Sequence, residues 1–232
     1  MRWTDRLSNS ERRVLAKKIH AHRARQPLHN NLMYSAGRRL KHFSGAQFVG
    51  ILSQHASKLK RPLRFFDSGA GLGGVGADIK RTLGAKVEVT TFSLRTPHIS
   101  GETKSSSVKH VTHFVQEYFP YPSETAKEEG KRLGVQHRKR LDQAKVDAKL
   151  IDHSRVGLLE NMKISKKYDV IFESSGPLQY SEYRERVVDR YYKMLPKGGL
   201  LMLSLDQIPH ALLFGKFNLV GELDKIAIYE KK

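Results

Sequence analysis

One acidic residue and the glycines after it form the part of the sequence best suited to bind a small molecule. Asp67 follows an apolar run, residues 63–66, that predicts a buried strand. Glycines allow a sharp turn and let a ligand approach the backbone without a Cβ in the way. Residues 75–83 then have helical spacing, so the stretch predicts the strand, turn and helix start of a nucleotide-binding unit. The glycines are Gly69, Gly71, Gly73, Gly74 and Gly76.

The position of the acid argues against a nicotinamide dinucleotide. A dinucleotide site places its ribose-binding carboxylate about 20 residues after the glycines. That place is the end of the next predicted strand, residues 86–92, where Thr90, Thr91 and Phe92 stand and no carboxylate is found. The acid at position 67 comes before the first glycine instead.

The spacing Asp67-x-Gly69-x-Gly71-x-Gly73 resembles motif I of the class I S-adenosylmethionine (SAM) methyltransferases. Two further stretches resemble that family in the same order, residues 168–176 and the turn and strand at residues 195–203. The resemblance spans about residues 45–232. It implies an α/β fold with a doubly wound, mostly parallel, seven-stranded Rossmann-like methyltransferase sheet.

The resemblance also implies which residues hold SAM. Asp67, Gly69, Gly71 and Gly73 would surround it. Thr91 aligns with the family's acid for the ribose hydroxyls, although a threonine makes one hydrogen bond where a carboxylate accepts two. Glu117 falls near the third motif, close to the adenine.

A catalytic base is needed only if the methyl acceptor is an amine or a hydroxyl that must lose a proton. Glu173 falls at the family's fourth motif, beside the methyl group, and is the best-placed candidate. Tyr180 is the second. For Asp67, Glu117 and Glu173 alike, the alternative interpretation is a solvated carboxylate at a strand end.

Strands and helices alternate along the chain, which predicts a parallel, doubly wound sheet whose ligands bind beyond the carboxyl ends of the strands. A closing hairpin would form the mixed edge. Expected helices are residues 44–59, 75–83 and 181–195, and expected strands are residues 63–66, 86–92, 108–115, 168–172, a strand ending at Ser204, 217–223 and 225–229.

The charge is strongly positive and uneven. The net charge is +19, and residues 1–64 hold 15 Lys or Arg against two acids. This excess favours a polyanionic partner, most often RNA, over a merely solvated basic surface or an anionic membrane. Residues 1–44 are predicted to be a basic helical extension that contacts RNA, or alternatively a solvated helix packed on the domain. Its candidate phosphate contacts are Arg12, Arg13, Lys17, Lys18, Arg23 and Arg25.

A second basic segment, about residues 120–167, predicts a helical insertion between the third and fourth strands of the domain formed by residues 45–232. It is either a further RNA contact, through Arg138, Lys139 and Arg140, or a solvated helix.

Cysteine is absent, which excludes disulfides, thiolate zinc sites and a cysteine nucleophile. Its absence fits a reducing compartment, the cytoplasm or the mitochondrial matrix. None of the 11 histidines has convincing metal-ligand spacing, and no apolar run approaches the roughly 18 residues of a membrane span.

Two functions follow. The first is a SAM-dependent methyltransferase acting on RNA, such as rRNA or another structured RNA. The second is a catalytically weak or inactive protein of the same fold that binds RNA or the ribosome as an assembly factor, which Thr91 and the unusual loop after Glu173 favour. A protein or small-molecule methyltransferase leaves the basic extension unexplained.

Overall fold

The computed structural model describes residues 39–71, 73–93, 135, 139, 142–174, 176–181, 183–204 and 210–232. Its centre is one seven-stranded sheet with the order β3-β2-β1-β4-β5-β7-β6. β7 runs antiparallel to both β5 and β6, and the other neighbouring strands pair in parallel. This arrangement confirms the predicted fold class. The strands are β1 (Leu63–Ser68), β2 (Val87–Ser93), β3 (His153–Val156), β4 (Val170–Glu173), β5 (Leu200–Ser204), β6 (Phe217–Leu223) and β7 (Ile226–Lys231).

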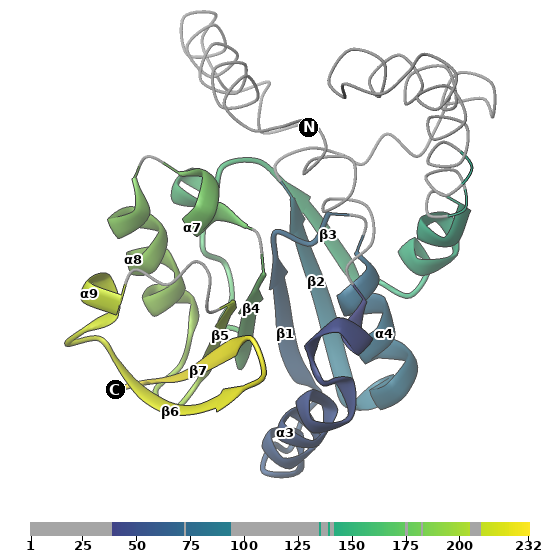
Figure 1. The fold of residues 1–232 in the computed structure, drawn as a ribbon, viewed down its shortest axis with the longest axis horizontal. Helices are drawn as coiled ribbons and strands as arrows, with labels where there is room; N and C mark the ends of the chain where they lie inside the picture. Colours follow the sequence, from purple (N-terminus) through teal and green to yellow (C-terminus); the bar gives the residue numbers. More distant parts are fainter. Residues whose placement is uncertain are drawn as a thin grey trace, which may run out of the picture.

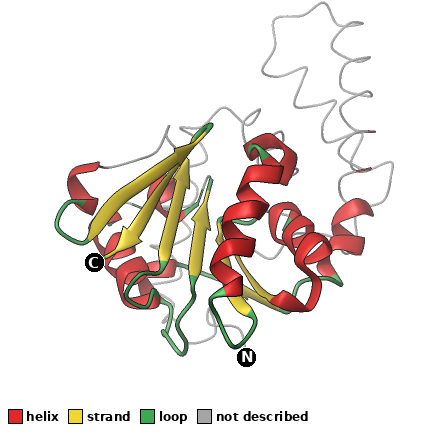
Figure 2. Cartoon of the chain, turned by 90° about the horizontal axis from the view of Figure 1, so that it is seen from below, coloured by secondary structure: helices red, strands yellow, loops and turns green. Residues whose placement is uncertain are grey.

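Helices cover both faces of the sheet (Figures 1 and 2). Because both faces are buried, β4 and β5 are nearly continuous apolar runs rather than alternating ones. One face carries η2 (Leu40–Phe43), α3 (Gly45–Ser57), α4 (Gly74–Leu83) and the adjoining turn η3 (Gly84–Lys86), and the other carries α7 (Pro177–Tyr180), α8 (Arg184–Met194) and α9 (His210–Leu213).

Neighbouring residues of β1 contribute to two separate cores. Phe65 packs with Phe48 of α3 and Phe172 of β4. Phe66 belongs to the opposite core, with Tyr168 at a ring distance of 4.7 Å. Phe43 of η2 also meets Phe172 edge to face, so the described end of the predicted extension packs on the domain.

The third strand differs from the prediction. The strand beside β2 is His153–Val156, which the sequence pattern assigned to the helical insertion, whereas residues 108–115 lie outside the described part. The long basic segment therefore belongs to the β2–β3 connection and not to the β3–β4 connection. The error has a physical reason: β3 is a short edge strand with exposed His153 and Ser154, so it lacks the apolar run that marked the central strands.

The β3–β4 connection, residues 157–169, is described throughout and contains only a 3-10 turn, η4 (Leu159–Asn161), and no α-helix. Met162 and Ile164 pack against the core in place of a covering helix. Among the described residues, cover over β2 and β3 on this face is therefore thin. Among the described residues, no helix is long and apolar enough to cross a membrane.

Candidate functional site

The candidate site lies where the chain reverses its direction of winding. From β1 the chain moves outward through β2 to β3, and it then returns to β4 on the other side of β1 (Figure 1). Ligands of doubly wound sheets bind at the carboxyl ends of the strands beside such a switch point.

The turn after β1 requires glycine at three positions. Gly69, Gly71 and Gly73 have φ angles of 91°, 54° and 78°, a region that favours glycine. The N–H groups of Gly69 and Ala70 both donate to the Phe92 carbonyl oxygen, at 2.9 and 3.0 Å, which fixes the turn to the end of β2. The predicted glycine turn is confirmed in its conformation.

The start of α4 is packed tightly against the sheet. A Cβ added at Gly76 would lie 2.9 Å from Cγ1 of Val89, so only glycine permits this approach of helix and strand. Gly74 and Val75, the first two helical residues, have no hydrogen-bond partner for their N–H groups among the described residues. Unpaired donors and the helix dipole make this helix start favourable for a negatively charged group.

Asp67 lies beside the same helix start. Its side chain is 3% exposed, and its Oδ2 accepts a hydrogen bond from the Gly76 N–H at 3.3 Å. Burial raises the pKa of Asp67 to about 7, and the Gly76 hydrogen bond opposes that rise. Ionising this carboxylate is thus costly unless a cation lies beside it. A carboxylate that binds a positively charged ligand is expected to have this property.

Thr91 lies within β2 and not at its end. It pairs with Asp67 across the sheet, and the strand continues for two more residues to Ser93. Its Cγ2 would lie 3.8 Å from a Cβ added at Gly73. The methyl group therefore packs beside the helix-side end of the glycine turn.

Glu173, the predicted base, ends β4 and is 1% exposed. Its Oε1 accepts the Leu178 N–H at 2.7 Å, which caps the start of α7. Its Oε2 accepts a hydrogen bond from the Tyr191 hydroxyl of α8, and that hydroxyl also lies 2.6 Å from Ser68 Oγ. Both oxygens of Glu173 thus have partners inside the protein.

Burial, followed by the charge of Glu173, raises the pKa of Tyr191 well above its ordinary value. Tyr191 therefore stays protonated and remains the donor to Glu173. Sequence reasoning placed Tyr191 in the core and missed this role, as it missed that of Ser68. A tyrosine on the apolar face of a helix is itself the signal, since a buried phenol needs a hydrogen-bond partner.

The loop after β4 folds back onto the tip of β1. A Cβ added at Gly176 would lie 2.4 Å from the Ser68 carbonyl oxygen and 2.9 Å from Glu173 Cγ. Gly176 is therefore needed for the loop after β4 to approach the end of β1 closely. This approach brings the tips of β1 and β4 and the start of α7 together.

The remaining predicted residues are less fully described. Tyr180 is the last residue of α7, and its side chain lies outside the described part. Glu117 and the six basic residues of the extension also lie outside it, as do Arg138 and Arg140. Lys139 is helical and exposed. No group of three or more His, Asp or Glu residues that could hold a metal ion occurs within the described ranges.

The strand order and the switch point define a doubly wound, Rossmann-like α/β fold. No protein-family model matches the sequence, and no curated protein matches it. Among solved structures, TrmN from Thermus thermophilus is 16% identical with a TM-score of 0.45, over 81% of this chain and 48% of that one.

Two other solved structures are similar to this chain to a comparable degree. A TehB-like SAM-dependent methyltransferase from Corynebacterium glutamicum is 15% identical with a TM-score of 0.45, over 81% of this chain and 96% of that one. Ribosomal protein L11 methylase from Lactobacillus delbrueckii subsp. bulgaricus is 16% identical with a TM-score of 0.41, over 79% of this chain and 77% of that one. This chain spans about half the length of TrmN. Likeness of this degree carries nothing about ligand or substrate.

Proposed function

We propose that this protein is a SAM-dependent methyltransferase that acts on RNA. The observation that carries the proposal is the combination of Asp67 with a glycine turn whose three glycines all have left-handed φ angles. Sequence resemblance and geometry agree on this one stretch.

The chemistry of the turn fits SAM. The methionine part of SAM carries a carboxylate and an ammonium group, next to a sulfonium. The N–H groups of Gly74 and Val75, which have no partner among the described residues, suit the carboxylate, and the buried Asp67 carboxylate suits a positive charge. Gly69, Gly71 and Gly73 leave the backbone free of Cβ atoms for close approach. SAM would supply the methyl group, and the protein would supply alignment and electrostatic stabilisation for an in-line displacement.

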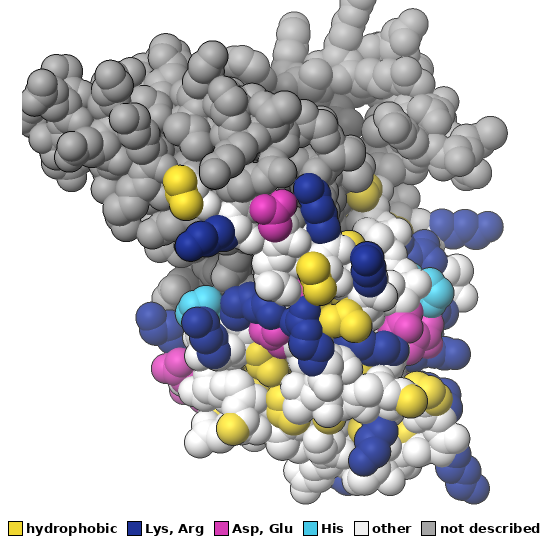
Figure 3. All heavy atoms as spheres, turned by 90° about the vertical axis from the view of Figure 1, so that its right-hand side faces the viewer, with side chains coloured by type: hydrophobic (Ala, Val, Ile, Leu, Met, Phe, Trp, Pro, Cys, Tyr) yellow, Lys and Arg dark blue, Asp and Glu magenta, His cyan; other side chains and the backbone are white. Residues whose placement is uncertain are grey.

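The positive charge and its points of attachment support RNA as the substrate. Arg39, in the described end of the predicted basic extension, is ion-paired with Asp78 of α4 and with Asp147. Asp147 lies in the helical segment 142–148, at the end of the basic β2–β3 connection, and also pairs with Arg81 of α4. Both basic segments therefore join the domain at α4, the helix whose start faces the glycine turn. Lys and Arg predominate over Asp and Glu on the described part of this side (Figure 3).

The geometry around Glu173 favours the second candidate, an RNA-binding assembly factor without activity. Glu173 is buried with both oxygens hydrogen-bonded, so acting as a base would require it to lose the bond from Tyr191 or from Leu178. Thr91 also stands where the family has an acid for the ribose. These features weaken proton abstraction and ribose binding, but they leave the Asp67 turn intact.

A calorimetric titration of SAM into the purified protein separates the two candidates. Micromolar binding, with transfer of a labelled methyl group to RNA but not to bulk protein, supports the enzyme. Salt-sensitive RNA binding without detectable SAM binding supports the assembly factor.

A further inference from the structure

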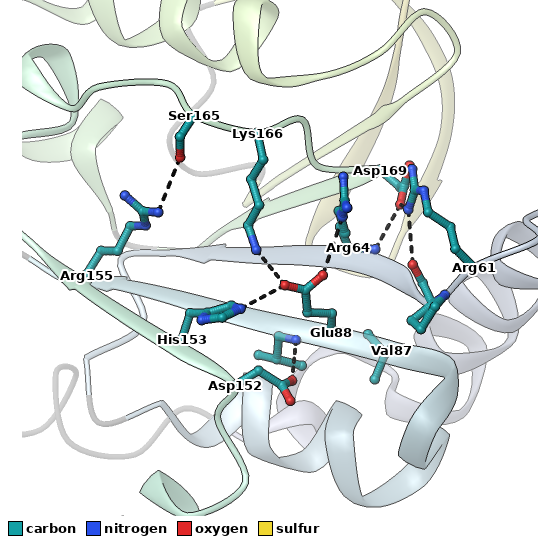
Figure 4. A network of polar contacts seen from close by, with 12 residues as sticks. Arg61, Arg64, Val87, Glu88, Asp152, His153, Arg155, Ser165, Lys166 and Asp169 are labelled. Carbon is teal, nitrogen blue, oxygen red and sulfur yellow. Dashed lines mark hydrogen bonds and ion pairs between the residues drawn. The ribbon is translucent and has the colours of Figure 1, made fainter.

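Charged side chains that are partly exposed gather on one face of β1 to β3. On strands β1 to β3, residues at alternate positions share a face. Arg64, Glu88, His153 and Arg155 lie on the face that carries Phe66 and Phe92, and Lys166 reaches it from the β3–β4 connection (Figure 4). We call these five residues the sheet-face cluster. A doubly wound fold usually covers such a face with an α-helix, and residues 157–169 contain only the 3-10 turn η4.

Three basic side chains of the cluster converge on one carboxylate. Glu88 lies 2.8 Å from His153 Nε2, 2.5 Å from Lys166 Nζ and 3.4 Å from Arg64 Nε. The hydrogen bond from Lys166 is the largest cause that lowers the pKa of Glu88, and His153 adds to it. The side chains stay accessible, with exposed fractions of 21% for Lys166, 35% for Arg64 and 50% for His153.

The sheet-face cluster contains more cations than acids. Arg64, Arg155 and Lys166 are cations facing the single acid Glu88. Arg155 contacts only the neutral Ser165 Oγ, at 3.4 Å, among the contacts drawn in Figure 4.

The two neighbouring acids do not reduce this excess. Asp169 is held by both guanidinium nitrogens of Arg61, at 2.7 and 2.8 Å. Asp152 is held by Lys80 Nζ at 2.8 Å. Each of these acids thus has its own cation, and the cluster remains positive.

We propose that the sheet-face cluster binds the phosphate backbone of RNA. This inference rests on the proposed RNA substrate and adds a contact within the folded domain, apart from the basic extension. The cations come from two strands and a loop and are partly exposed rather than enclosed in a pocket, which suits a polymer better than a small anion. The partner is identified by charge complementarity, in a protein of net charge +19.

Glu88 gives the proposal an unusual test, because this acid competes with phosphate for the same cations. The full-length Arg155→Gln/Lys166→Gln variant should bind a structured rRNA fragment about tenfold more weakly at 0.15 M salt than wild type does. The slope of log affinity against log salt should fall by about 1.5 to 2, since two phosphate contacts are lost. Glu88→Gln should instead bind several-fold more tightly.

A matched control removes the same charge elsewhere. Lys197 and Lys225 are exposed on the β5–β7 side of the sheet, so Lys197→Gln/Lys225→Gln should leave affinity within twofold and the slope unchanged. Equal losses in both double variants, or weaker binding by Glu88→Gln, would overturn the proposal. If the double variant does not fold, Arg155→Gln alone replaces it in the test. This single change removes only one 3.4 Å hydrogen bond and should not disturb folding.

The outcomes also separate this inference from the proposed function. Wild-type RNA binding that the cluster variants do not change rejects the cluster alone. SAM binding without any RNA binding by wild type rejects the RNA substrate, and the cluster with it. SAM affinity should be the same in all variants, because none of the altered residues lies at the glycine turn.

Discussion

The tips of β1 and β4 are neighbours in the sheet, and each carries a buried carboxylate near a glycine that a larger residue could not replace. Asp67 on β1 has one hydrogen bond from the helix start, at 3.3 Å, and a pKa raised to about 7. Glu173 on β4 accepts the Leu178 N–H at 2.7 Å and the hydroxyl of Tyr191. Burial alone therefore does not identify the ligand-binding acid. Among the described residues, Asp67 has fewer and weaker partners than Glu173, and on that difference we propose it as the ligand-binding acid.

The comparison predicts that SAM affinity depends on Asp67 and not on Glu173. Asp67→Asn should weaken SAM binding by about 100-fold or more, because a neutral amide cannot form an ion pair with a cationic ligand. Glu173→Gln should change SAM affinity by less than about threefold, although methyl transfer would fall if Glu173 is the base. Calorimetric titration of both variants checks this. A similar loss of affinity in both would remove the distinction between the two strand tips.

The same Asp67→Asn variant should be more stable than wild type at pH 8. Because the folded pKa is about 7 against an ordinary value of 3.8, the folded protein holds a proton that the unfolded chain releases. Asp67 thus lowers stability as the pH rises between those two values. Removing the charge should raise the free energy of unfolding by about 1–3 kcal/mol at pH 8, with little change at pH 4. Urea unfolding at both pH values measures it.

The β4 tip should be more sensitive to shape than to charge. Gly176→Ala should lower the free energy of unfolding by about 2–3 kcal/mol, because the added Cβ would lie 2.4 Å from a backbone oxygen. Gly50→Ala is the matched control: nothing lies within 4 Å of its Cβ, and within α3 alanine should stabilise by about 0.5–1 kcal/mol. A neutral effect of Gly176→Ala would show that the loop after β4 is not pressed against β1.

Much of this architecture could be predicted from the sequence, because the central strands are buried on both faces. The runs around Ile171 and Leu201 are continuous and apolar, and the glycine turn is recognisable from its composition. The third strand could not be predicted in this way. His153 to Val156 lie at a sheet edge with one neighbouring strand, so their burial pattern is weak.

The site was predictable in part. The conformation of the glycine turn was predictable because it follows from residue type, whereas the role of Asp67 in binding stays a prediction. The partners of Glu173 were not, because Tyr191 and Leu178 reach it only through the packing of α7 and α8. Thr91 was placed at a strand end, but β2 continues to Ser93.

The bond between Tyr191 and Glu173 should contribute to stability without contributing to SAM binding. Tyr191→Phe leaves the Glu173 carboxylate and Ser68 without their shared partner, which should lower the free energy of unfolding by about 1–2 kcal/mol. Thermal unfolding with and without SAM measures it. A loss of SAM affinity beyond about threefold would place Tyr191 in the binding site instead.

The smallest effect is expected at Thr90, inside β2. Its Oγ1 is the only buried side-chain oxygen or nitrogen atom without a hydrogen-bond partner among the described residues. Thr90→Val keeps the shape and removes that atom, so stability should stay within about 1 kcal/mol of wild type or rise. A larger loss, measured by urea unfolding, would reveal a partner for the hydroxyl.

The central claim is that the ionised Asp67 carboxylate holds a cationic ligand, and the pH dependence of SAM binding by wild type tests it most directly. Titrations at pH 6 and pH 8 should give an affinity about tenfold higher at pH 8, with a proton released on binding at pH 6, because SAM would bind the ionised form of a group whose pKa is about 7. Equal affinity at the two pH values without proton release, or no binding at either, would contradict the account.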